Sequence, residues 1–181
     1  SKDAIWVNLF IGNSAQINIG NKTLNIDMQT QYPWNGKVTL ALNTTGRIKH
    51  ELKIRIPSWC DKFNIERNGK KTTYSTDNGY IVLKKWKSGD QITLNMDMPV
   101  KIMAADPRVK EDVGLRAIQR GPLVYCMEEV DNSDTYDNFS LSPMTQFSVK
   151  TDSICHMPVQ SILAQSNGKT AKYIPYYAWD N

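Results

Sequence analysis

The chain has 181 residues, enough for one ordinary domain or two small β-sandwiches. Its hydrophobic fraction of 40% and charged fraction of 22% are typical of a globular protein and exclude a disordered or collagen-like chain. The net charge of +4 comes from 22 basic residues scattered among 18 acidic ones, so we expect no nucleic-acid partner. No apolar run approaches the roughly 20 residues that cross a bilayer, so we expect no membrane partner either.

Apolar residues at every second position predict strands in the first hundred residues. The first run covers residues 5–11, with Ile5, Val7, Leu9 and Ile11 expected on one face. Further strands are predicted at residues 24–28, 38–42, 52–56, 63–65, 80–82 and 92–98. Turn-forming pairs such as Asn68-Gly69 separate these runs. Short strands with such turns predict an all-β fold, an antiparallel β-sandwich of jelly-roll or immunoglobulin-like type.

The pattern changes at residues 99–108, where prolines interrupt the last strand and begin a turn. We therefore assign residues 1–105 to one complete sandwich and residues 106–181 to a second. A hairpin is predicted from residues 115–119 and 123–127. Beyond the polar stretch 131–136 the apolar runs weaken, so we expect the second sandwich to be incomplete at its C-terminus. Residues 1–3 lead straight into a strand without a signal peptide, and we expect the sequence to be a piece of a longer protein.

The sequence offers few groups for metal or redox chemistry. Its three cysteines, Cys60, Cys126 and Cys155, show no C-x-x-C spacing, and we expect buried free thiols. One disulfide with a thiol left over is the alternative. The two histidines are His50 and His156, and the second should point away from Cys155 across a strand. We therefore expect no metal site and no cofactor in this chain.

The acidic residues do not predict a catalytic site. Glycoside hydrolysis needs two carboxylates held across a sugar-sized cleft. The densest acidic cluster, Glu128-Glu129 with Asp131, more closely resembles a solvated edge. No G-x-S-x-G nucleophile motif occurs. We expect no catalytic residue.

Aromatic residues supply the candidate binding positions. Tyr176, Tyr177 and Trp179 near the C-terminus are candidates for stacking on sugar rings. Trp6 and Trp34 are candidates for packing one domain against another, and Arg120 is a candidate for reaching a carboxylate across such an interface. The alternatives for each tryptophan are the core and a sugar-stacking position, and the alternative for Arg120 is an exposed turn. For the three C-terminal rings, the alternative is exposure through the loss of a covering segment.

Several collinear segments carry a family resemblance. They are residues 6–12 (WVNLFIG), 32–38 (YPWNGKV), 54–60 (IRIPSWC), 68–69, 79–80, 86–90 (WKSGD), 98–100, 106–109 and 119–126 (QRGPLVYC). In order and spacing, this set resembles the C-terminal region of the bacterial β-L-arabinofuranosidase family, glycoside hydrolase family 127 (GH127), formerly a domain of unknown function. The resemblance covers residues 4–130 well and residues 174–179 more loosely.

The resemblance implies an (α/α)6 catalytic barrel followed by two β-sandwiches, with a zinc-bound cysteine nucleophile and a glutamate acid/base. Those residues lie upstream of the matched region, and Cys60 and Cys126 correspond to sandwich positions. The resemblance therefore implies a non-catalytic accessory region that packs against and stabilises the barrel of its parent glycoside hydrolase. It also implies a periplasmic or extracellular parent.

Two other classes of function stay open from the residues alone. An autonomous carbohydrate-binding module would present exposed aromatic residues on one face and would bind glycans. A protein-interaction sandwich would instead show an apolar patch without such a line of rings.

Overall fold

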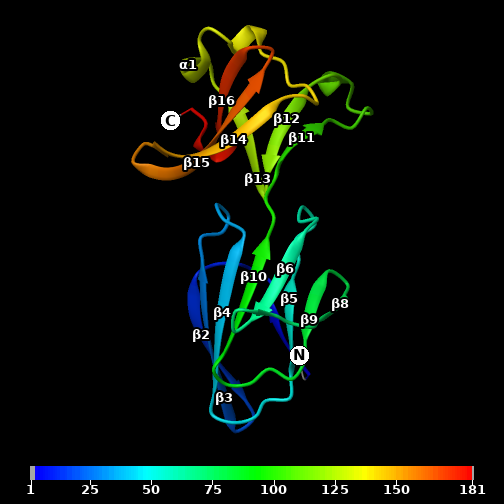
Figure 1. Cartoon of the computed structure of the whole chain (residues 1–181), viewed down its shortest axis with the longest axis vertical. Coiled ribbons are helices and arrows are strands. Elements are labelled where there is room, and N and C mark those ends of the chain that lie inside the picture. The colour runs from blue at the N-terminus through cyan, green and yellow to red at the C-terminus, as the bar shows by residue number, and fades with distance from the viewer. Residues whose placement is uncertain (1–2, 181) are drawn as a thin grey trace. The chain divides into compact units, whose positions relative to one another are not determined.

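The computed structural model describes residues 3–180 and shows an almost entirely β-stranded protein (Figure 1). The chain forms two compact units, Ser1–Met98 and Pro99–Asn181. Among the described residues, all strand pairs but one are antiparallel, so the antiparallel all-β class expected from the sequence is confirmed. Within residues 3–180, no helix has the length and apolarity needed to cross a membrane.

The first unit is a sandwich of two sheets. One sheet has the order β1 (Ala4–Val7), β5 (Glu51–Arg55), β9 (Tyr80–Leu83), β8 (Ser75–Asp77). The other has the order β2 (Asn13–Ile19), β3 (Lys22–Thr30), β4 (Lys37–Thr44), β10 (Asp90–Met96), β6 (Phe63–Arg67), β7 (Lys70–Lys71). The exceptional pair is β1 with β5, which run parallel.

The core of this unit follows directly from alternation in the strands. Leu40 of β4 and Leu94 of β10 are each 1% exposed and point from one sheet toward the other. Leu52 and Ile54 of β5 and Ile81 of β9 meet them from the facing sheet, all fully buried. Because the side-chain period of a strand is two, each strand gives one apolar face to this common core.

The first predicted strand is shorter than its alternation suggested. Beyond Val7, the residues expected to face inward face outward, and the reverse. β1 ends at Val7, and the chain then crosses to the other sheet, where β2 begins at Asn13. Phe10 turns inward at 5% exposure, whereas Leu9 and Ile11 are 65% and 63% exposed. The expectation that Leu9 and Ile11 share the inner face of Val7 is therefore wrong, because leaving a sheet breaks the two-residue register.

The second unit contains one six-stranded antiparallel sheet. Its order is β11 (Val100–Ala104), β12 (Arg116–Arg120), β13 (Leu123–Met127), β16 (Lys169–Pro175), β15 (Met157–Ser166), β14 (Gln146–Ile154). The predicted hairpin is present as β12 and β13. A two-sheet sandwich was expected here, but the strands described in this second unit all belong to one sheet. β16 pairs with β13 on one side and with β15 on the other, and β15 pairs with β14.

Short helical segments and loops cover this sheet. They are η1 (Lys110–Asp112), α1 (Glu129–Asn132), η2 (Tyr136–Asn138) and η3 (Tyr176–Ala178). After η2, Phe139 and Leu141 pack on a core that includes Ile118, Tyr125 and Tyr173. A connecting segment thus buries one face of the sheet in place of a second sheet.

Three sequence expectations differ from the structure near these strands. The expected boundary at residues 105 and 106 falls after β11, whereas the two units divide between Met98 and Pro99. Cys155 and His156 do not alternate along a strand. They form the tight turn between β14 and β15, both with positive φ, and Cys155 is exposed, not buried.

Candidate functional site

The aromatic residues of the C-terminal segment form an exposed cluster in the second unit. Tyr176, Tyr177 and Trp179 are 59%, 51% and 56% exposed. The rings of Tyr176 and Trp179 are nearly parallel, with an interplanar angle of 4° and centroids 6.1 Å apart. The η3 turn brings these two side chains together, since the Trp179 N–H donates to the Tyr176 carbonyl at 3.1 Å. The three predicted sugar-stacking residues are therefore neighbours in space and accessible.

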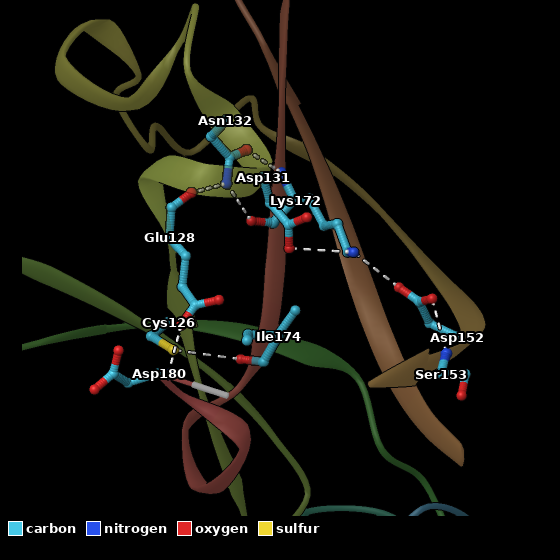
Figure 2. A network of polar contacts seen from close by, with 9 residues as sticks. All are labelled: Cys126, Glu128, Asp131, Asn132, Asp152, Ser153, Lys172, Ile174 and Asp180. Atoms are coloured by element: carbon cyan, nitrogen blue, oxygen red, sulfur yellow. Dashed lines mark hydrogen bonds and ion pairs between the residues drawn. The ribbon is translucent and has the colours of Figure 1, made fainter. Parts of the chain in front are cut away.

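This aromatic segment is fixed to the end of β13. The backbone N–H of Asp180 donates to Glu128 Oε1 at 2.8 Å, and the Cys126 thiol donates to the Ile174 carbonyl at 3.8 Å (Figure 2). Burial, with a contribution from Glu128, raises the pKa of the Cys126 thiol. Burial, and to a smaller extent the electrostatic effect of Tyr125, raises the pKa of Tyr177. These residues hold the aromatic segment in place, and the raised pKa of Cys126 opposes formation of a reactive thiolate.

The hydrogen bonds of Asn132, here called the polar clasp, join α1 to β16 (Figure 2). Asn132, only 5% exposed, donates to the carbonyls of Glu128 at 2.7 Å and Lys172 at 3.0 Å. Its side-chain oxygen accepts the Lys172 N–H at 2.7 Å. A buried amide whose donors and acceptor are all used is typical of a structural residue.

Lys172 also links two carboxylates from separate elements. Its ammonium lies 3.1 Å from Asp131 in α1 and 3.1 Å from Asp152 in β14 (Figure 2). Burial lowers the pKa of Lys172, but the two carboxylates outweigh it and leave that pKa raised. The Ser153 N–H, and after it Lys172, lower the pKa of Asp152. Lys172 and Asp152 are therefore charged at neutral pH, and the ammonium of Lys172 links β16 to both α1 and β14.

The acidic cluster singled out in the sequence is thus divided between structural contacts. Glu128 accepts a hydrogen bond from the aromatic segment, and Asp131 pairs with Lys172. Among residues 3–180, no three His, Cys, Asp or Glu side chains gather in a way that could hold a metal ion. Cys60, Cys126 and Cys155 are all free thiols.

The three predicted interface residues lie in different surroundings. Trp6 in β1 is 42% exposed. Trp34 is half-buried in the turn between β3 and β4. Arg120, at the end of β12, faces Tyr125 of the same unit. Burial raises the pKa of Tyr125, and the positive charge of Arg120 partly offsets that rise. Trp6 is therefore the most accessible of the three, and an interface role for each stays a prediction.

A basic hollow in the first unit was not predicted from the sequence. Residues 44–49 and 85–88 line a space of about 600 Å³. Arg47, Lys49, Lys85 and Lys87 border it, and no carboxylate does. The two segments are far apart in the sequence, so only the fold gathers their charges. Such a hollow attracts anionic groups.

Comparison with known proteins gives matches to two family models. The model described as "Beta-L-arabinofuranosidase, GH127 middle domain" matches residues 4–98. The model described as "Glycoside hydrolase family 127 C-terminal domain" matches residues 100–181. The junction of the two matches coincides with the division between the two compact units.

Individual relatives agree with these matches. A non-reducing end β-L-arabinofuranosidase of Bifidobacterium longum subsp. longum is 35% identical over 139 residues, which cover 74% of this chain and 20% of the relative. A crystal structure of a GH127 β-L-arabinofuranosidase from Geobacillus stearothermophilus T6 superimposes with a TM-score of 0.88 at 30% identity, over 99% of this chain and 32% of the other.

A second solved structure, described as a glycoside hydrolase, gives a TM-score of 0.90 at 31% identity over 100% of this chain and 34% of its own. The chain therefore spans about a third of the solved relatives and a fifth of the curated one. Together the two family models account for nearly every residue, and the chain belongs to glycoside hydrolase family 127, as its middle and C-terminal domains.

Proposed function

We propose that this chain is the non-catalytic accessory region of a larger β-L-arabinofuranosidase-like glycoside hydrolase, where it packs against and stabilises an (α/α)6 catalytic barrel. The observation that carries the proposal is the part of the family's full-length proteins that this chain matches. The middle and C-terminal family models match residues 4–98 and 100–181, while the solved relatives are about three times as long.

The chemistry of the described residues supports the same proposal. In the densest acidic cluster, Glu128 holds the aromatic segment and Asp131 pairs with Lys172. The cysteine nearest to them, Cys126, donates to a backbone carbonyl and has a raised pKa. The chain alone therefore turns over no arabinofuranoside and holds no cofactor, and the zinc site of the parent lies in the preceding domain.

The stabilising role can be tested on the parent enzyme. The catalytic part should be prepared with and without the two accessory domains, and its thermal unfolding followed by calorimetry. We expect the midpoint of the catalytic transition to fall by several degrees without them, because a lost interface removes stabilising contacts. An unchanged midpoint would contradict a stabilising role.

A second candidate function, glycan binding, is favoured by the accessible Tyr176–Trp179 pair. Two nearly parallel rings, both more than half exposed, offer flat apolar surface of the kind that stacks on sugar rings. Affinity electrophoresis through an arabinan gel tests it. The chain should be retarded, Trp179→Ala should abolish the retardation, and Tyr136→Ala, at a 40% exposed tyrosine outside the segment, should keep it. Unretarded migration of the unaltered chain would refute this function.

A further inference from the structure

We propose that the part of the first unit formed by Trp6, Leu9, Ile11 and a hollow beside Trp6 is the surface on which the preceding domain of the parent chain docks. We call it the β1 surface. The proposal rests on the proposed accessory function and names the part of the chain that performs it.

The three exposed apolar side chains of the β1 surface lie close together along the chain. Trp6, Leu9 and Ile11 are 42%, 65% and 63% exposed and lie within six consecutive residues. Since an extended chain advances at most about 3.6 Å per residue, these side chains lie within roughly 20 Å of one another. Phe10 fills the core between them, so Leu9 and Ile11 are both directed outward. Large exposed apolar side chains gathered in a short segment are a feature of interaction sites.

The same residues are held rigidly. The Phe10 ring meets Tyr32 edge-on at 5.5 Å, which fixes the backbone from which Leu9 and Ile11 project. Trp6 contacts Tyr80 edge-on at 4.8 Å, and the Lys53 ammonium lies 4.7 Å from its ring centre. A surface ordered before binding loses little side-chain entropy when a partner covers it.

A hollow of about 400 Å³ adjoins Trp6. Its lining combines β1 with β2 and includes Ile17, Ile19 and His50. β1 and β2 are each the outermost strand of their sheet. Exposed sheet edges in native proteins are usually covered or otherwise protected, because they invite unwanted pairing. The hollow therefore lies where the sandwich itself provides no cover.

The matching family model identifies the occupant. Residues 4–98 match a domain described as the middle one, so a further domain precedes it in family members. β1 begins at Ala4, only two residues before Trp6, so the preceding domain is tethered within reach of this surface. Such a tether gives a high effective concentration and favours this domain over a free partner. The β1 surface thus docks the catalytic domain of its own chain.

Cysteine labelling can test this docking. Leu9→Cys and Ile11→Cys are made separately in the full-length parent and in this chain, with Cys155→Ser to remove the exposed thiol. Lys70→Cys, at an exposed position in β7 of the other sheet, is the matched control. Maleimide incorporation at each introduced cysteine is timed by peptide mass spectrometry, which separates it from any cysteine of the parent.

We expect both test cysteines to react at least tenfold more slowly in the parent than in this chain, with the control unchanged. Equal rates in the two proteins would overturn the proposal. Slow, concentration-dependent labelling in this chain alone would also overturn it, since a second copy would then cover the surface. Failure of the accessory function itself would appear separately, as arabinofuranosidase turnover by this chain.

Discussion

Replacing Asn132 by alanine tests the clasp that joins α1 to β16. The substitution removes three hydrogen bonds, of 2.7, 3.0 and 2.7 Å, from a residue that is 5% exposed. Each such bond contributes about 1 kcal/mol net, so we expect the second unit to lose about 3 kcal/mol of unfolding free energy. That loss corresponds to roughly a hundredfold faster hydrogen exchange of the amides that the unit protects.

Hydrogen exchange with mass spectrometry on peptides spanning residues 123–135 and 169–175 measures this effect. Val130→Ala is the control, because Val130 lies in the same short helix and is 85% exposed, so its truncation should change stability by less than about 0.5 kcal/mol. Peptides of the first unit supply an internal reference. If the amides of these peptides exchanged no faster in Asn132→Ala than in Val130→Ala, the hydrogen bonds of Asn132 would not hold α1 on β16.

Three further predictions concern stability. Leu94→Ala, at a 1% exposed core position, should cost the first unit about 2–5 kcal/mol in urea unfolding. Gly36→Ala should cost about 1–3 kcal/mol in the same assay, because its Cβ would lie 2.0 Å from the Met96 carbonyl oxygen and the backbones would have to part. The contribution of the Lys172–Asp152 pair to the free energy of unfolding should be constant near neutral pH. Since the folded pKa of Asp152 is depressed, the stability that this carboxylate contributes is lost as pH falls below the ordinary 3.8. Since the folded pKa of Lys172 is raised, the stability that this ammonium contributes is lost as pH rises past the ordinary 10.5. Urea unfolding of Lys172→Met across pH should lack this loss at high pH but keep part of the loss at low pH, because the Ser153 N–H still lowers the pKa of Asp152.

Strands with strict alternation could be predicted from the sequence. Residues 38–42 and 92–98 fall largely in β4 and β10, because each buries one face and exposes the other. The weaker runs near Val149 and Leu163 belong to the long strands β14 and β15, which the sequence did not predict as such. In β14 few residues are buried, so its pattern carries no alternating apolar signal.

Features that depend on contacts between distant segments could not be predicted. The parallel pairing of β1 with β5 joins Ile5 to Leu52, and nothing local specifies that partner. The outward direction of Leu9 results from the crossing between sheets, which no two-residue period contains. Tyr176 and Trp179 were sequence candidates for stacking on sugars, but their parallel rings depend on the η3 turn.

The most direct test of the accessory role is turnover. Hydrolysis of a chromogenic β-L-arabinofuranoside should be measured for this chain beside the full-length parent, with zinc and a reductant present. The account predicts activity from the parent and none above background from this chain. Turnover by this chain would contradict the account and would mean that the described residues contain a catalytic site.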